Sequence, residues 1–300
     1  MIIASMNKDQ LKALLKDRLY QYYLLTRLNK PIGIFLLLWP TLWALWIAGE
    51  GKPDLLVFFV FVTGVVLMRS AGCVINDYAD RKIDPLVART RLRPIASGMV
   101  APKEALGLFV GLCLTAFVLV LLMNKFTIYL SFGGALLASI YPFMKRYTHL
   151  PQVVLGMAFG WAIPMAFAAQ TGEIPKVAWL LFVVNVVWSV AYDTMYAMAD
   201  KEDDLKAGVK STAILFDDMD KVMIGMLQVI VLVGLYLIGK QLQLGMVFNI
   251  SLVVASGFAL YQQKLINNRF PQQCLQAFLN NNWFGLTIFV GLALHYLFET

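Results

Sequence analysis

The chain has 300 residues, of which 60% are hydrophobic and 14% are charged; its formal net charge is +7 and its mean hydropathy is +0.70. This composition excludes an ordinary soluble domain. Apolar runs of membrane-spanning length recur along the sequence, so we predict an all-α, polytopic membrane protein that lies in a lipid bilayer.

The first 30 residues are polar and basic, and their leucines recur at helical spacing. This pattern predicts an amphipathic segment, residues 1–30, on the cytoplasmic membrane surface. The segment lacks the short apolar core of a cleavable signal peptide.

Nine transmembrane helices are predicted, in a single domain whose first half is 31–150 and whose second half is 151–300. Their expected positions are 32–48, 55–78, 103–123, 126–143, 152–170, 176–199, 222–239, 245–263 and 281–298.

Lysine and arginine are distributed very unevenly between the two sides of this topology. With the N-terminus in the cytoplasm, 20 of the 25 basic residues lie in cytoplasmic segments and four lie on the other side. Because cytoplasmic loops of membrane proteins are enriched in basic residues, we predict this orientation.

An acidic motif follows the second predicted span. If the helix continued, Asn76, Asp77, Asp80 and Asp84 would fall within an arc of about 100°. Carboxylates that crowd one helix face repel one another and resist burial, and a hard divalent cation is their ordinary compensation. The alternative is a solvated acidic helix end without a ligand.

A second acidic motif ends the sixth predicted span. Asp193, Tyr196, Asp200 and Asp204 share a face about 80° wide, whereas the adjacent acidic residues 202 and 203 point elsewhere and are expected to be solvated. Both motifs end on the predicted cytoplasmic side. We therefore expect them to form two halves of one site.

Two carboxylate clusters suit two Mg²⁺ ions, which complete their coordination with water and phosphate oxygens. The expected ligand is a diphosphate, and basic residues on the same side could hold its remaining charge. The available basic residues are Arg89, Arg93, Lys145, Arg146, Lys206 and Lys210. Their alternative explanation is that cytoplasmic loops are basic. A Gly-rich nucleotide loop is absent from the sequence, so a nucleoside triphosphate is not the expected ligand. A diphosphate site at the edge of a bilayer favours a lipid diphosphate, and no nucleic-acid partner is expected.

These motifs resemble a known family. The run from Asn76 to Arg81, with Asp84, Arg89-Thr90 and Arg93-Pro94, resembles the first signature of the UbiA-type intramembrane prenyltransferases. The run from Asp193 to Asp200, with Asp204 and Lys210-Ser211-Thr212, resembles the second. Together with residues 141–146, the motifs are most similar to the branch that prenylates 4-hydroxybenzoate in ubiquinone synthesis.

The resemblance implies nine transmembrane helices around a central cavity in a bacterial inner membrane, with a cytoplasmic active site. It implies that Mg²⁺ ions and the diphosphate are bound by five residues: Asn76, Asp80, Asp84, Asp200 and Asp204. Asp77 and Asp193 would support that shell, Tyr196 would pack against it, and Arg146 would bind diphosphate. The implied reaction transfers a polyprenyl group from a polyprenyl diphosphate to the ring carbon ortho to the hydroxyl of 4-hydroxybenzoate.

The benzoate carboxylate needs a cation, for which Arg69 and Arg27 are our hypotheses; no base for the ring proton is assigned. One alternative is a relative with another acceptor, such as haem, a dihydroxynaphthoate or chlorophyllide. The other is a cation-coupled transporter, whose carboxylates would be expected nearer the membrane midplane.

Overall fold

The computed structural model describes residues 8–86 and 90–299, and within these ranges the fold is entirely helical. The α-helices are α1 (Lys8–Leu25), α2 (Ile32–Ala48), α3 (Leu55–Asp80), α4 (Pro102–Val120), α5 (Lys125–Met144), α6 (Pro151–Gly160), α7 (Ala162–Thr171), α8 (Lys176–Ala207), α9 (Thr212–Phe216), α10 (Asp220–Gln241), α11 (Met246–Ile266) and α12 (Pro271–Phe298). Two short 3₁₀ helices, η2 (Asp84–Leu86) and η3 (Asp217–Met219), complete the list.

Within the described ranges, eight helical segments are long and apolar enough to cross a membrane, with α6 and α7 together forming one of them. The 17-residue α2 is a ninth, shorter apolar helix, and its length is at the lower limit for a span. The predicted all-α membrane fold is therefore confirmed.

Three helix ends differ from the sequence expectation. Residues 200–207 were expected in a loop but extend α8, and α12 begins ten residues before 281, at Pro271. Conversely, α3 ends at Asp80, so the expected helix through Asp84 is wrong. Gly208 ends α8 in a left-handed conformation, φ +68°, which glycine adopts without steric strain.

The chain divides into two compact units. The first comprises Met1–Pro31 with Leu67–Thr115, and the second comprises Ile32–Val66 with Ala116–Thr300. The division at residue 150 within one domain, expected from the sequence, stays a prediction. Each unit carries one of the two acidic motifs.

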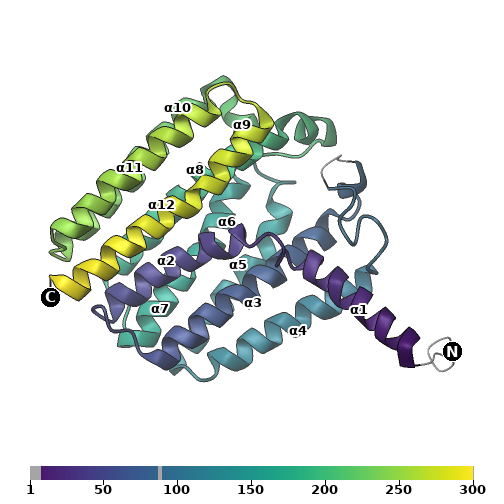
Figure 1. Cartoon of the computed structure of the whole chain (residues 1–300), viewed down its shortest axis with the longest axis horizontal. Helices are drawn as coiled ribbons and strands as arrows, with labels where there is room; N and C mark the ends of the chain where they lie inside the picture. The colour runs from purple at the N-terminus through teal and green to yellow at the C-terminus, as the bar shows by residue number, and fades with distance from the viewer. Residues whose placement is uncertain (1–7, 87–89, 300) are drawn as a thin grey trace. The chain divides into compact units, whose positions relative to one another are not determined.

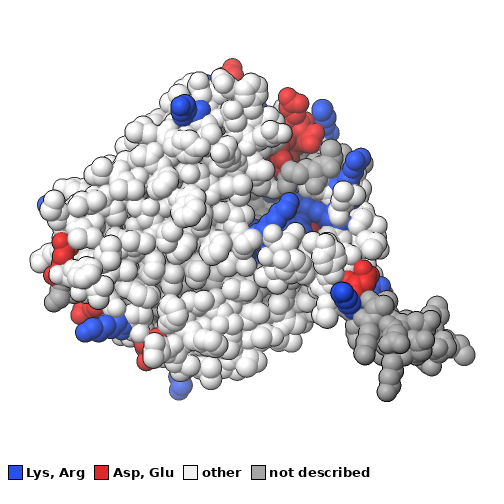
Figure 2. Space-filling model, in the orientation of Figure 1, with Lys and Arg blue, Asp and Glu red and all other residues white. Residues whose placement is uncertain are grey.

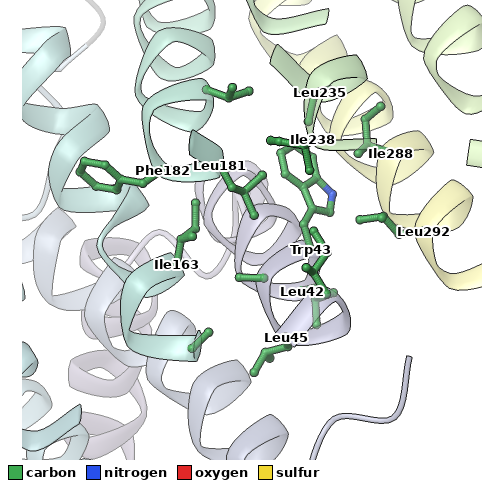
Figure 3. Close-up of a cluster of buried hydrophobic side chains, with 14 of the residues drawn as sticks. Leu42, Trp43, Leu45, Ile163, Leu181, Phe182, Leu235, Ile238, Ile288 and Leu292 are labelled. Atoms are coloured by element: carbon green, nitrogen blue, oxygen red, sulfur yellow. The ribbon is translucent and has the colours of Figure 1, made fainter. Parts of the chain in front are cut away.

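In the second unit, Trp43 of α2 extends among apolar side chains of α8, α10 and α12 (Figure 3). Its indole N–H donates to the Gly285 carbonyl at 3.1 Å, which satisfies a polar group that lies inside an apolar core. Trp188 of α8 likewise donates to Asn281 at 2.9 Å, and the two indole rings lie 5.3 Å apart. These contacts fix α2 and α8 against α12.

Helix α6 approaches α8 closely through two glycines. A Cβ on Gly156 would lie 3.0 Å from Ser189 Cβ, and one on Gly160 would lie 2.7 Å from Asn185 Nδ2. Two glycines four residues apart are a common means of close helix packing in membranes. This contact positions the long α8, whose far end carries the second acidic motif.

The outward faces of the helices are apolar, as a bilayer requires. Large hydrophobic side chains are exposed along the second unit, among them Phe132, Leu136, Val229 and Leu260. In Figure 2, the charged side chains of the second unit near α10, α11 and α12 lie toward the ends of these helices, and the surface between the ends is uncharged. In Figure 1, α10, α11 and α12 run side by side.

Candidate functional site

The first acidic motif lies at the end of α3, in the first unit. Asp80 is 2% exposed, and Asn76 Nδ2 donates to its Oδ2 across one helical turn at 3.4 Å. Asn76 is half-buried. An amide and a carboxylate one turn apart form a polar surface at the end of an otherwise apolar helix, as the helical spacing predicts.

Asp77 points to a different set of partners. Arg27 Nη2 donates to its two carboxylate oxygens at 2.9 and 2.7 Å, and Arg93 Nη1 donates to its Oδ1 at 3.1 Å. The carboxylate is 2% exposed, and the two guanidinium groups compensate the cost of burying its negative charge. Asp77 thereby ties both the turn after α1 and the loop after α3 to α3 itself.

Asp84 lies beyond the end of α3, at the start of η2, and therefore does not share a helix face with Asn76 and Asp80. Arg93 Nη1 donates to its two oxygens at 3.1 and 3.0 Å, and Thr90 Oγ1 donates to its backbone carbonyl at 2.9 Å. Burial raises the pKa of the Asp84 carboxyl, and the nearby Arg93 opposes that shift. The loop, and not a continued helix, positions Asp84.

Arg93 was considered only as one of several basic residues on the cytoplasmic side. In the structure it links Asp77 and Asp84, which is a specific structural role. The signal in the sequence was its place within the run Arg91-Leu92-Arg93-Pro94, but a basic loop residue has many possible partners. Arg89, which was expected to bind substrate, lies outside the described residues.

The second acidic motif lies on α8, in the second unit. Asp193, Tyr196, Asp200 and Asp204 are all helical and half-buried, so they share one face as their spacing predicts. The Tyr196 ring packs edge-on against Phe278 of α12, with centroids 5.0 Å apart. The adjacent Glu202 is exposed, as expected for a solvated residue.

A short segment after α8 is held next to this motif. The Lys210 backbone N–H donates to the Lys145 carbonyl at 3.0 Å, which brings two predicted site residues together. Two residues further along the chain, the hydroxyl of Thr212 lies 2.6 Å from that of Thr194, and the Thr212 N–H donates to Gln152 at 3.2 Å. Sequence reasoning missed these hydrogen bonds: Thr194 lies within the second motif but was given no partner, and Gln152 stands in an apolar run without a motif of its own.

The remaining predicted cations have local contacts. Arg146 lies over the Phe143 ring at 5.6 Å, and Arg69 donates to Cys73 Sγ at 3.0 Å within α3. Lys206 is largely exposed, and its ammonium lies 3.9 Å from Asp203. An exposed pair at this distance contributes little to stability, so Lys206 remains accessible to solvent.

The donor groups suit Mg²⁺ that is bound together with a phosphate ligand. Among the described residues, no three His, Cys, Asp or Glu side chains converge as a protein-only metal cluster. Mg²⁺ commonly binds one or two carboxylates and completes its octahedron with water and substrate phosphate oxygens. Asn76 and Asp80 in the first unit offer oxygen donors of this kind, and so does Asp200 in the second unit, whereas soft metals prefer sulfur or imidazole.

Comparison with known proteins agrees with the motifs. The model of the UbiA prenyltransferase family matches residues 37–288. The chain is 63% identical over 282 residues to a 4-hydroxybenzoate octaprenyltransferase of Methylococcus capsulatus, covering 94% of this chain and 97% of the relative. It is 62% identical over 283 residues to the protein of the same name from Nitrosococcus oceani, covering 94% of this chain and 99% of that one.

Solved structures share the fold. The apo structure of a UbiA homolog from Aeropyrum pernix superposes with a TM-score of 0.76 at 23% identity, covering 87% of this chain and 97% of that one. A UbiA homolog from Archaeoglobus fulgidus bound to GPP and Mg²⁺ has a TM-score of 0.66 at 17% identity, covering 91% and 99%. The family expected from the two acidic motifs is confirmed: this chain belongs to the UbiA prenyltransferase family.

Proposed function

We propose that this protein transfers a polyprenyl group from a polyprenyl diphosphate to the ring carbon ortho to the hydroxyl of 4-hydroxybenzoate, and releases diphosphate. The observation that carries the proposal is the pair of acidic motifs at the ends of α3 and α8, in a chain about 60% identical to enzymes with that activity in their names. The UbiA homolog that binds GPP and Mg²⁺ supports the diphosphate and metal assignments.

Asn76, Asp80 and Asp84 of the first motif, with Asp200 and Asp204 of the second, are the proposed Mg²⁺ ligands. When bound, two Mg²⁺ ions would neutralise the negative charge that develops on the departing diphosphate. In the first motif, Arg93 holds Asp84 by both oxygens and so orients it before any ligand arrives. Asp193 lies about two turns before Asp200 on α8 and would support the ligands of the second motif.

Asp77 was expected on the metal-binding face of the first motif, and its two arginine partners favour a different contribution. Its oxygens accept hydrogen bonds from two guanidinium groups, those of Arg27 and Arg93, whereas the oxygens of Asp84 accept from Arg93 alone. We assign Asp77 a positioning role: it holds Arg93, and through Arg93 it holds Asp84. Its carboxylate would reach a metal only by giving up one of these contacts.

Cations of the segments around the second motif complete the diphosphate site. Lys145 and Arg146 directly follow α5, and the Lys210 backbone N–H donates to the Lys145 carbonyl, so the segments that carry these three cations lie side by side. Guanidinium groups suit phosphate because they donate two parallel hydrogen bonds. Lys206 and Arg89 are proposed as further contributors.

The bond changes follow from this charge arrangement. The allylic C–O bond breaks, and its electron pair leaves with the diphosphate. The electron-rich carbon ortho to the hydroxyl then forms the new C–C bond, and loss of the proton from that carbon restores the aromatic ring. Apolar helices exclude water, which would otherwise capture the allylic cation.

The carboxylate of 4-hydroxybenzoate requires a cation, and the contacts of Arg27 favour Arg69 for this role. Arg27 Nη2 contacts both oxygens of Asp77, which has only 2% exposure. Removing Arg27 from that pair would leave a buried carboxylate with a single partner. Arg69, within the span of α3, is therefore the better candidate.

We further propose that the protein resides in a bacterial inner membrane with both motifs on the cytoplasmic side. The support is the 20-to-4 distribution of basic residues. The second unit agrees with it, since Lys145, Lys210 and Lys221 lie at one end of its helices and Lys125 and Lys176 lie at the other.

The experiment is a prenyl-transfer assay on the full chain in detergent, with radiolabelled 4-hydroxybenzoate and geranyl diphosphate, with Mg²⁺ or with EDTA. Asp80→Asn and Asp200→Asn test one motif each, and Glu202→Gln is the matched control on α8. We expect product only with Mg²⁺. The rate of prenyl transfer should fall about 100-fold or more in each Asn variant, and the control should keep the rate of the unaltered protein.

Product that forms equally in EDTA would overturn the metal assignment. No product from folded protein would overturn the acceptor, and a dihydroxynaphthoate and haem would then be tested in its place.

To examine Arg69, the KM for each substrate is measured in Arg69→Ala. A larger increase for 4-hydroxybenzoate than for the diphosphate supports the assignment, and equal increases reject it.

A further inference from the structure

A groove lies between α10 and α11 in the second unit. It has a volume of about 500 Å³. Its walls are one face of each helix, because the lining positions recur at spacings of three and four residues. The lining residues are Lys221, Val222, Gly225, Gln228, Val229 and Leu232 of α10, and Ser256, Ala259, Leu260 and Gln263 of α11 with Asn267 after it.

Small side chains create the hollow. Gly225, Ser256 and Ala259 leave space that larger side chains would fill. A Cβ on Gly225 would have Gln263 as its nearest neighbour, at 3.6 Å, so that glycine opens onto the groove and not onto a backbone. The apolar side chains of Val229 and Leu260 are 58% and 72% exposed on the outer wall.

The polar side chains in the walls are bonded to each other. Gln263 Nε2 donates to Gln228 Oε1 at 2.9 Å, and Gln228 Nε2 donates to the buried Gln262 at 2.8 Å. Gln262 in turn donates to Asn280 of α12 at 3.0 Å. This chain of amides fixes the distance between α10 and α11, so the groove is held open by hydrogen bonds.

The groove has the length of one membrane leaflet. Eleven residues separate Lys221 at its mouth from Leu232 at its deep end, which corresponds to about 16 Å along a helix. The hydrocarbon core of a bilayer is about 30 Å thick, so the groove extends from the basic ends of the helices to about the midplane. An acyl chain of a lipid in that leaflet has a similar length and is apolar, like the walls of the groove.

The mouth of the groove is positively charged. Lys221 Nζ donates to the Asn267 carbonyl at 3.0 Å and to Asn267 Oδ1 at 3.5 Å, which leaves one proton for another acceptor. The neighbouring Asp217 is paired with Lys201 at 2.8 Å, and the buried Asp220 with Arg269 at 2.8 Å. Lys264 and Asp218 are also exposed there, which leaves a net charge of about +1 at the mouth.

We propose that this groove binds a phospholipid with an anionic headgroup, with one acyl chain between α10 and α11 and the phosphate at Lys221. Three features support this occupant: a lysine at headgroup depth, an apolar hollow one leaflet long, and walls held apart by satisfied amides. Basic pockets between transmembrane helices are known to recognise anionic headgroups. None of the residues that line the groove is a proposed Mg²⁺ or diphosphate ligand.

The test uses the full chain, purified in detergent and incubated with phosphatidylglycerol or phosphatidylcholine, and native mass spectrometry to count retained lipids. Gly225→Leu fills the hollow, and Lys221→Gln removes the charge. The controls are Gly257→Leu, an open position on α11, and Lys240→Gln, at the other end of α10.

We expect the unaltered protein and both controls to retain phosphatidylglycerol about fivefold better than phosphatidylcholine. Lys221→Gln should lose that preference and still retain lipid, whereas Gly225→Leu should retain less of both. Equal retention in Lys221→Gln and the unaltered protein overturns the proposal, whether or not Gly225→Leu folds. A dimer that Gly225→Leu dissociates would also overturn it, because the groove would then hold a second copy of the chain.

Discussion

Arg27 Nη2 donates hydrogen bonds to the two oxygens of Asp77 at 2.9 and 2.7 Å, across 50 residues of sequence. Arg27 adopts a left-handed conformation, φ +60°, in the turn after α1, while Asp77 lies in the last turns of α3. This ion pair therefore joins the N-terminal segment to the helix that carries the first acidic motif.

Replacing Arg27 with alanine should destabilise the protein by about 2 kcal/mol, because a buried carboxylate then keeps only Arg93 as a partner. The melting temperature in detergent measures the effect. Arg18→Ala is the matched control, since Arg18 pairs with Glu104 at 3.3 Å with both side chains partly exposed; that change should cost less than about 1 kcal/mol. Equal effects of the two substitutions would show that Arg27 is an ordinary surface cation.

Replacing Asp77 with asparagine should reduce prenyl transfer even though no metal contact is assigned to Asp77. Loss of its charge loosens Arg93, which also holds Asp84. We expect weaker Mg²⁺ binding, measured by titration calorimetry in the presence of diphosphate, as well as slower turnover. Unchanged Mg²⁺ affinity would remove the link between Asp77 and Asp84.

Gly156→Leu should lower stability by about 1–3 kcal/mol, because the added side chain forces α6 away from Ser189 and the Val186 backbone of α8. Gly107→Leu, on an exposed face of α4 with open space around it, is the control and should leave the melting temperature unchanged or raise it. If both variants melt alike, the close approach of α6 and α8 does not contribute to stability.

Thr212→Val should raise the KM for the prenyl diphosphate severalfold while lowering stability by only about 1 kcal/mol. The hydroxyl contact with Thr194 at 2.6 Å helps to hold the segment that carries Lys210. Thr194 keeps its bond to the Val190 carbonyl, so no hydroxyl is left unsatisfied. Thr115→Val, which removes a hydroxyl bonded only within α4, should leave the KM unchanged.

Mg²⁺ with inorganic diphosphate should raise the melting temperature, since a ligand present at about 100 times its dissociation constant stabilises by about 2.7 kcal/mol. EDTA should abolish the shift. Asp80→Asn and Asp200→Asn should each reduce it, because each removes a proposed ligand charge. A full shift in both variants would mean that the metal is held elsewhere.

Much of this protein could be predicted from its sequence. The hydrophobic runs define the transmembrane helices because hydrocarbon tolerates only segments whose backbone hydrogen bonds are satisfied internally. The i, i+4, i+8 spacing of Tyr196, Asp200 and Asp204 predicted one helix face, and α8 does continue through all three. The family followed from the two acidic motifs, which lie in the same order as in its members.

The errors in the prediction occur where helices end. Asp84 was placed on a helix face by extending the period of α3, but α3 stops at Asp80 and a loop bonded to Arg93 positions Asp84. The reverse error concerns the end of the sixth span, which was placed at residue 199, although α8 continues through polar residues to Ala207. Local composition does not determine such boundaries, since capping and tertiary contacts decide them.

The sequence by itself determined the membrane class, the number of apolar helices and the residue types available for binding Mg²⁺ and diphosphate, because hydropathy and helical spacing act locally. Only the tertiary structure decided that Asp77 is bound by Arg27 and Arg93, that Thr212 meets Thr194, and that small residues open a groove beside Lys221. These contacts join residues far apart in the chain, and a side chain's partner depends on which segments packing brings within hydrogen-bond reach.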